Sequence, residues 1–316
     1  MRAVFASALD DADPLAALSV GEQPDPDPTP GWTTVEVRAS SLNHHDLWSL
    51  RGVGLAADQL PMILGCDAAG IDPDGNEVVV YPVIPDPDDP RGRSILSERH
   101  PGTFADRVAV PRANLVPKPA GLSFAEAACL PTAWLTAYRM LVTTGRVEQG
   151  ESVLVQGAGG GVATAAVVLA VALGKRVYAT SRDGAKRERV AALGATAAVP
   201  GTRLPERVDV VIETVGEATF DHSMKSARPG ARIVVSGATS GHRPPVDLRR
   251  VFAMQLEILG TSMGTIGELR ELVALCDRRG IRPAIDTEFG FTEIRQAFAR
   301  LQTGAVFGKL VLDHRR

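Results

Sequence analysis

The chain has 316 residues, of which 45% are hydrophobic and 22% are charged, and its formal net charge is −3. This length allows two domains, the composition is that of an ordinary soluble globular protein, and the weak charge gives no support for nucleic acid or an anionic membrane as a partner. No run of about 18 apolar residues is present, so we expect no membrane span. The three cysteines, Cys66, Cys129 and Cys276, are too scattered for a disulfide framework, which favours a cytoplasmic location.

The first third of the chain predicts strands. Residues 35–39 and 105–110 alternate between apolar and polar side chains, and 77–81 is a short apolar run. Two stretches rich in proline and aspartate, 24–30 and 82–90, separate these strands as loops. The pattern indicates an irregular, β-rich domain.

From Ser123 onward, helices alternate with strands. Ser123 and Glu126 have the spacing of a capping box, which predicts that a helix begins there. Strands are predicted at 152–155, 176–180, 208–214, 231–236 and 257–261, with helices at 164–173, 185–193 and 218–227. Such alternation is typical of a parallel, doubly wound sheet with right-handed crossovers. A helix at 292–302 and a strand at 309–312 end the chain.

The stretch 152–163 predicts a buried strand, a glycine turn and the start of an alanine-rich helix. The turn contains Gly157, Gly159, Gly160 and Gly161, and Val162 follows it. A helix N-terminus carries unpaired N–H groups and a partial positive charge, and glycines let a diphosphate approach the backbone closely. Ala163 replaces the last glycine of the usual pattern and still allows close helix packing. This context predicts a dinucleotide-binding site.

The end of the next strand indicates which nicotinamide cofactor is used. An acidic residue there would bind the ribose 2′-hydroxyl and repel a 2′-phosphate, but this chain has Ser181, Arg182 and Lys186 in that region. These side chains can bind a phosphate, so NADPH is predicted over NADH. Two alternatives stay open: Lys186 and Arg187 are solvated residues of an exposed helix, or Asp183 neutralises Arg182.

Seven segments together resemble one known family. They are 41–46 (SLNHHD), 64–70 (LGCDAAG), 135–138 (LTAY), the glycine turn, 209–216, 260–264 and 307–312 (FGKLVL). In this order they resemble the medium-chain dehydrogenase/reductase superfamily, and more narrowly its zinc-independent quinone oxidoreductase-like branch. The resemblance implies an α/β fold with a β-rich GroES-like catalytic domain at 1–119 and 283–316. It also implies a Rossmann doubly wound domain at 120–282, with an active site in the cleft between the two domains.

The resemblance also bears on zinc. The positions that match the catalytic zinc ligands of zinc-bearing relatives carry Asn43, Cys66 and Thr132, and two of these are poor zinc ligands. If 43–46 is a strand, His44 and His45 point to opposite faces and cannot share one ion. No C-x-x-C pair occurs for a structural zinc. We therefore predict no zinc. Without a Lewis acid, hydride transfer suits a conjugated acceptor, such as a quinone or enone, that spreads the arriving charge itself.

Candidate catalytic residues are Asn43, His45 and Tyr81. The resemblance implies that Asn43 faces the nicotinamide and hydrogen-bonds the ribose or the acceptor; a turn-forming asparagine is the alternative. His45 or His44 could donate a proton at neutral pH, or be an exposed residue. Tyr81 could donate a proton or simply pack.

Further cofactor-binding candidates are Thr136, Gly237, Met263, Gly264 and Lys309. Thr136 lies in a predicted helix, where its hydroxyl could instead bond to the helix backbone. The glycines and Met263 follow predicted strands of the doubly wound sheet, where ligands bind. Lys309 could equally be a surface charge.

These observations predict an NADPH-dependent, zinc-independent oxidoreductase that reduces a quinone, enone or related conjugated carbonyl. The alternatives are a zinc-type alcohol dehydrogenase and a non-catalytic, NADPH-binding redox sensor. A homodimer is expected by analogy, with the apolar strand at 256–259 pairing at a sheet edge.

Overall fold

The computed structural model describes residues 1–316, which form two compact units. Unit 1 contains Met1–Thr132 and Leu269–Arg316, and unit 2 contains Ala133–Glu268. The segments 120–132 and 269–282, which the sequence placed in the Rossmann domain, are grouped with unit 1. For the first segment the reason is packing, because helix α2 (Phe124–Ala128) contacts the main sheet of unit 1.

Unit 1 is built from strands, as predicted, and its main sheet has the order β10-β6-β5-β3-β18-β17, with β9 also paired to β3. A second sheet has the order β2-β1-β4, and β7 pairs with β8. The strands are β1 (Arg2–Ala6), β2 (Leu18–Glu22), β3 (Trp32–Ser41), β4 (Met62–Ile63), β5 (Asp67–Ile71), β6 (Glu77–Val80), β7 (Val83–Pro85), β8 (Arg93–Ile95), β9 (Arg107–Pro111), β10 (Leu115–Pro117), β17 (Ile285–Phe289) and β18 (Lys309–Asp313).

The register of three neighbouring strands positions a group of polar residues. Strand β3 pairs antiparallel with β5 on one side and with β18 on the other, and Ser41 lies opposite both Asp67 and Val311. The end of β3, the start of β5 and the start of β18 therefore meet at one edge of the sheet. This register decides which side chains near residue 43 can touch.

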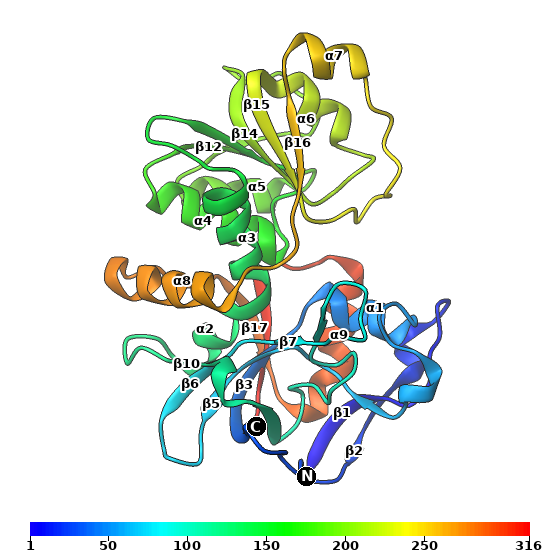
Figure 1. Ribbon diagram of the computed structural model, residues 1–316. Helices are drawn as coiled ribbons and strands as arrows, with labels where there is room; N and C mark the ends of the chain where they lie inside the picture. Colours follow the sequence, from blue (N-terminus) through cyan, green and yellow to red (C-terminus); the bar gives the residue numbers. More distant parts are fainter. The chain divides into compact units, whose positions relative to one another are not determined.

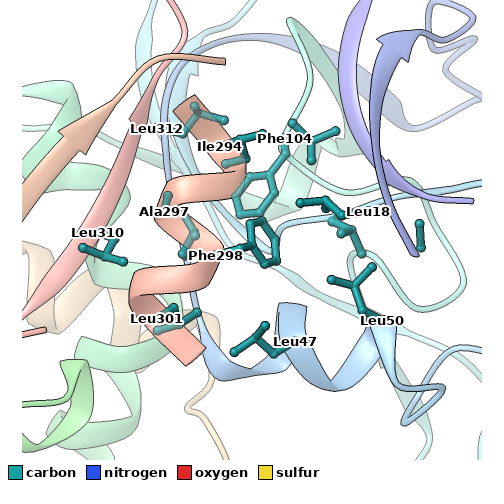
Figure 2. Packing of buried hydrophobic residues seen from close by; sticks show 14 of the residues in the cluster. Leu18, Leu47, Leu50, Phe104, Ile294, Ala297, Phe298, Leu301, Leu310 and Leu312 are labelled. Carbon is teal, nitrogen blue, oxygen red and sulfur yellow. The ribbon is translucent and has the colours of Figure 1, made fainter. Parts of the chain in front are cut away.

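The core of unit 1 supports the helix that follows β3. Helices α1 (His44–Leu50) and α9 (Ile294–Thr303) pack against each other. Figure 2 shows Leu47 and Leu50 of α1 facing the same cluster as Phe298 of α9. Phe298 meets Phe104 edge to face, with ring centroids 6.2 Å apart. This packing holds α1 in a fixed orientation.

Residues 43–46 do not form a strand, so the strand-based argument that separated His44 from His45 does not apply. Asn43 is instead the N-cap of α1, and its backbone N–H donates to the Asp46 carboxylate at 2.7 Å. Leu47 and Leu50 are spaced as a helix requires to bury one face. The capping pattern and this spacing together favour a helix over a strand.

Unit 2 is a parallel, doubly wound α/β sheet, which confirms the predicted fold class. Its strand order is β13-β12-β11-β14-β15-β16, so the chain starts in the middle, builds one edge and then builds the other (Figure 1). The strands are β11 (Ser152–Val155), β12 (Arg176–Thr180), β13 (Thr196–Ala198), β14 (Val208–Glu213), β15 (Ala227–Val235) and β16 (Glu257–Gly260). The helices are α3 (Leu135–Arg139), α4 (Gly161–Ala172), α5 (Gly184–Ala192), α6 (Phe220–Ser226), α7 (Leu248–Ala253) and α8 (Ile266–Arg279), which ends in unit 1.

The central strands of unit 2 are apolar because both faces are covered. Every residue of β11 and β14 is buried, and α4 packs against β11 and β12. In such a sheet, ligands bind at the carboxyl ends of the strands where the order reverses, here between β11 and β14. None of the helices has the length and hydrophobicity needed to cross a membrane.

Candidate functional site

The glycine turn lies between β11 and α4, as the sequence predicted. Gly157 and Gly159 have φ of +68° and +143°, which only glycine adopts easily. Gly160 is the N-cap of α4 and has no side chain to accept from the amides of the first helical turn. A Cβ added at Gly160 would have no neighbour within 4 Å. The first backbone N–H groups of this twelve-residue helix thus have no capping side chain and lie next to open space. Such an arrangement fits a diphosphate.

Lys186 of α5 reaches back to this turn. A Cβ on Gly159 would lie 3.1 Å from Lys186 Nζ, so the ammonium lies directly over the turn. Asp183 is occupied as the N-cap of α5, where its carboxylate accepts from the backbone N–H of Lys186. Arg182 is exposed, and Arg187 donates to the carbonyls of Ser181 and Arg182. Lys186 and Arg182 therefore place two positive charges around the turn.

A buried polar network lies beneath the turn. Thr180 accepts from the backbone N–H of Gly157 at 3.2 Å and donates to the Gln156 amide oxygen at 2.6 Å. The Gln156 amide nitrogen donates to Ser223, which in turn donates to Glu213. Glu213 also accepts the backbone N–H groups of 215 and 216. The network ties the carboxyl ends of β11, β12 and β14 together.

The remaining cofactor candidates of unit 2 lie where the sequence suggested. Gly237 follows β15, and a Cβ there would be 3.0 Å from the carbonyl oxygen of Thr214. Met263 and Gly264 follow β16, and a Cβ on Gly264 would lie 2.6 Å from Leu135 of α3. Thr136 is buried in α3. Close packing against Thr214 and Leu135 is therefore sufficient to explain why both positions are glycine.

In unit 1, the strand register brings Lys309, Asn43 and Asp67 together. The Lys309 ammonium donates to the Leu42 carbonyl at 2.7 Å and to the Asn43 side-chain oxygen at 2.6 Å, and lies 3.4 Å from an Asp67 oxygen. Lys309 is only 2% exposed and Asp67 is fully buried. The same Asp67 oxygen accepts from the Asn43 amide nitrogen and the Ser41 hydroxyl, both at 2.8 Å. We call Ser41, Asn43, Asp67 and Lys309 the lysine cluster.

Next to the lysine cluster, α1 contributes a second acid and a histidine. Burial raises the pKa of Asp46 to about 6, against the opposing effects of His45 and of the backbone N–H of Asn43. His45 lies 3.3 Å from Glu98, which also pairs with Arg91 at 3.0 Å. Burial opposes ionisation of Glu98, but the bond and charge of His45 and the charge of Arg91 outweigh it, so its pKa is lowered. The His45 ring is thus paired with the Glu98 carboxylate, and through Glu98 it is linked to the Arg91 guanidinium.

The three positions that match zinc ligands do not make a zinc site. Cys66 lies 3.7 Å from the Asn43 amide nitrogen and 3.6 Å from the Thr132 hydroxyl, so one thiol faces two neutral groups. Burial, with the nearby carboxylates, raises the pKa of Cys66 well above its usual value. A zinc ion needs deprotonated or strongly donating ligands, which Asn43 and Thr132 are not.

A different set of three potential metal ligands, which includes Cys66, lies close together. One ligand atom each from His45, Asp46 and Cys66 lies within 4.8 Å of the others. Nδ1 of His45 and Oδ1 of Asp46 are buried and have no hydrogen-bond partner. These three residues are the ones that could hold a cation, since His and Asp are ordinary metal ligands.

Tyr81, the third predicted catalytic residue, follows directly after β6. Its backbone N–H donates to the Asn114 carbonyl, and the Asn114 amide donates to the Tyr81 carbonyl at 2.8 Å. The side chain is 9% exposed. The backbone position of Tyr81 is therefore well fixed.

Several residues around these sites were missed from the sequence. None of Asp67, Gln156, Glu213 and Glu98 was singled out as a site residue. A polar residue at the end of an apolar strand, as in Gln156 and Glu213, was the available signal. Glu98 gave no such signal, because its partner His45 is 53 residues away.

The β-rich unit 1 and the doubly wound unit 2, with its glycine turn before α4, form an NAD(P)H-dependent oxidoreductase. The sequence matches the family model of the zinc-binding dehydrogenases over residues 161–278 and that of the alcohol dehydrogenase GroES-like domain over residues 29–120. The chain belongs to the medium-chain dehydrogenase/reductase superfamily, which confirms the family to which its motifs pointed.

Individual relatives differ in what their names state. A zinc-type alcohol dehydrogenase-like protein of Schizosaccharomyces pombe is 31% identical, over 90% of this chain and 91% of its own. An NADPH-dependent alkenal/one oxidoreductase, chloroplastic, of Arabidopsis thaliana is 30% identical, over 88% of this chain and 71% of its own. A crystal structure of an NAD-dependent alcohol dehydrogenase has a TM-score of 0.90 and 33% identity, and the match covers 99% of this chain and 100% of that one.

Proposed function

We propose that this protein is an NADPH-dependent, zinc-independent reductase of a conjugated carbonyl compound, either a quinone or an enone. The buried Lys309 ammonium beside Asn43 is the observation that carries the proposal. A cation in the lysine cluster disfavours a second, divalent cation close by. A bound nicotinamide would supply the hydride that reduces the acceptor.

The choice of NADPH rests on Lys186 and Arg182. Lys186 Nζ lies over the glycine turn, and Arg182 is exposed in the segment that follows β12. A 2′-phosphate gains charge-assisted hydrogen bonds from such groups, whereas a ribose 2′-hydroxyl gains little. Among the relatives, the Arabidopsis oxidoreductase is NADPH-dependent by name, and the alcohol dehydrogenase of known structure is NAD-dependent.

The choice of acceptor follows from chemistry without a metal. A saturated alcohol or aldehyde needs a Lewis acid to stabilise an alkoxide, whereas an enone or quinone delocalises the charge that hydride brings. The remaining requirements are a correctly positioned acceptor and a hydrogen-bond donor for the developing enolate. We propose Asn43, His45 and Tyr81 as the polar groups that serve the acceptor. His45 is suited to proton transfer because Glu98 orients its ring.

For the cofactor, we propose contacts with Thr136 and with the turn residues Gly157, Gly159, Gly160, Gly161 and Val162. The backbone at Gly237, Met263 and Gly264 completes the set, because it follows the strands at whose ends ligands bind.

The test is loss of nicotinamide absorbance with chelator-treated protein. NADPH and NADH are each paired with a panel of quinones, enones, aldehydes and saturated ketones. We expect turnover of the conjugated acceptors with NADPH, and no change when zinc is added. Turnover confined to aldehydes or saturated ketones, and restored only by zinc, would instead identify an alcohol dehydrogenase that uses His45, Asp46 and Cys66.

The same samples address the sensor alternative. Tight NADPH binding, seen by calorimetry, with no oxidation by any acceptor would favour a protein that reports the redox state. We further propose a cytoplasmic location, since Cys66, Cys129 and Cys276 are all buried free thiols.

We also propose that two copies of the chain pair through β16. This strand is the last in its sheet, so one edge of its backbone has no partner strand. Exposed apolar side chains gather on β16 and the preceding α7: Ile258 is 41% exposed, Leu248 71% and Phe252 72%. An unpaired edge with apolar neighbours fits a second copy related by a two-fold axis.

A further inference from the structure

The Lys309 ammonium uses all its N–H donors within unit 1. An ammonium has three N–H donors, and three oxygens surround it: the Leu42 carbonyl, the Asn43 side-chain oxygen and an Asp67 oxygen. With 2% of its surface exposed, Lys309 has no donor left for a ligand. Its effect on chemistry must therefore pass through the residues that it holds.

Of the three oxygens around the Lys309 ammonium, the Asn43 side-chain oxygen is the nearest, at 2.6 Å. The amide oxygen can only accept, and it faces Lys309, which can only donate. The amide nitrogen can only donate, and it faces the Asp67 carboxylate at 2.8 Å. These two partners permit only one orientation of the Asn43 amide. The second N–H then points toward the Ser41 carbonyl at 3.3 Å and Cys66 at 3.7 Å.

The backbone is built to place Lys309 at this point. Gly308 has φ of +100°, and a Cβ there would lie 2.1 Å from the carbonyl oxygen of Ala284, so no other residue fits. Strand β18 then starts at Lys309, and the pairing of Val311 with Ser41 sets Lys309 beside Asn43. The position of the cation is thus determined by the strand register.

A buried ion pair of this kind is a costly way to stabilise a fold. Removing the charges of Lys309 and Asp67 from water costs free energy, and apolar residues of similar size often give equal or better stability. Oδ1 of Asp67 is also buried without a partner, which adds to the cost. Stability alone therefore gives no reason for this arrangement.

We infer that Lys309 is a positioning residue, which orients the amide of Asn43 for the reduction of the conjugated acceptor. The inference rests on the proposed function for the role of Asn43, and on the lysine cluster for the geometry. Lys309 supplies in this way a fixed positive charge and a fixed orientation of the Asn43 amide oxygen, and it does not touch NADPH.

The geometric part is tested without any substrate. The chain contains three asparagines, Asn43, Asn76 and Asn114, so side-chain amide labelling with 15N gives three assignable NH2 groups in an NMR spectrum. We expect slow hydrogen exchange at Asn43, and faster exchange with a shifted signal in Lys309→Met. Lys118→Met is the matched control, because Lys118 also forms an ion pair in unit 1, with Glu77 at 2.7 Å. An Asn43 signal that is unchanged in Lys309→Met would overturn the inference.

The functional part uses a variant in which the buried charge is balanced. Lys309→Met leaves Asp67 without a cation and is expected to unfold more easily. The double variant Lys309→Met, Asp67→Asn removes both charges and keeps an acceptor for Ser41 and Asn43. We expect it to regain most of the lost thermal stability, with kcat still lower by on the order of tenfold and the KM for NADPH unchanged.

Two results would contradict this expectation. Recovery of kcat together with stability would mean that Lys309 is only structural. A rise in the KM for NADPH at constant kcat would mean that Lys309 binds the cofactor. If the wild-type protein reduces no acceptor, the proposed function fails, whereas the Asn43 signal still decides the geometric inference.

Discussion

The ammonium of Lys186 lies over Gly159, so a basic side chain from α5 reaches the turn between β11 and α4. A Cβ on Gly159 would be 2.9 Å from Lys186 Cδ and 3.1 Å from Nζ. Lys186 belongs to the first turn of α5, whose N-cap Asp183 fixes the start of the helix. A positive charge and the free amides of a helix N-terminus thus lie together, where each favours a bound phosphate.

Replacing this charge should separate the two nicotinamide cofactors. In Lys186→Gln, we expect the Kd for NADPH to rise about tenfold, equivalent to about 1.4 kcal/mol, with little change for NADH. The reason is that only NADPH carries the 2′-phosphate. Fluorescence titration of both cofactors measures this. Lys225→Gln is the control, since Lys225 is an exposed lysine of α6 that is paired with Asp221. Equal weakening of both cofactors would show that Lys186 binds the diphosphate instead.

Two glycines of the turn should respond differently to the same change. Gly157→Ala places a Cβ 2.4 Å from Val215 at φ of +68°, so we expect a loss of stability of about 1–3 kcal/mol. Gly160→Ala meets no atom within 4 Å, so the thermal midpoint should stay near that of the wild type while NADPH binding weakens. Thermal melts with and without NADPH measure both effects. Normal NADPH binding by Gly160→Ala would place the cofactor away from this turn.

His314 should make the protein sensitive to acid. Burial lowers the pKa of His314 to about 3, and its ring hydrogen-bonds to Ser40 and packs on Phe291. The unfolded chain binds a proton near pH 6.5 whereas the folded chain does not, so stability present above pH 6.5 is lost as the pH falls toward 3. The full effect is on the order of 5 kcal/mol.

Denaturant unfolding at several pH values measures this dependence. His314→Gln should flatten the loss of stability between pH 6.5 and pH 4, relative to the wild type. His242→Gln is the control, because His242 is exposed. Identical pH profiles for the wild type and His314→Gln would contradict the prediction.

A charge on the edge strand of unit 2 should prevent pairing of two copies. Ile258→Lys puts an ammonium on β16, where a second copy of the strand would bring another beside it. We expect a dimer for the wild type and a monomer for this variant, measured by light scattering after size-exclusion chromatography. Val199→Lys, at an exposed valine just after β13 on the opposite edge, should remain a dimer. A wild-type monomer would overturn the proposed pairing.

The sequence alone predicted the parallel, doubly wound unit well, because its signals are local. The apolar run at 152–155, the glycines and the alanine-rich helix lie next to each other in the chain, and the structure places them as β11, the turn and α4. The capping box of Ser123 and Glu126 is also local and was confirmed, with the Ser123 hydroxyl accepting from the backbone N–H of Glu126 at 3.2 Å. The seven segments that resemble the medium-chain dehydrogenase/reductases also predicted the superfamily correctly.

What the sequence alone could not provide was the arrangement of the polar groups of unit 1. Lys309 and Asn43 are 266 residues apart, and only the pairing of β18 with β3 brings them within 2.6 Å. The argument that His44 and His45 point to opposite faces assumed a strand, whereas Asn43 and Asp46 cap a helix there. Strand register and burial depend on the whole folded chain, and they decide which donors face which acceptors. Local patterns thus determined the fold class and the glycine turn between β11 and α4, whereas the tertiary structure decided that a buried lysine, Lys309, holds Asn43.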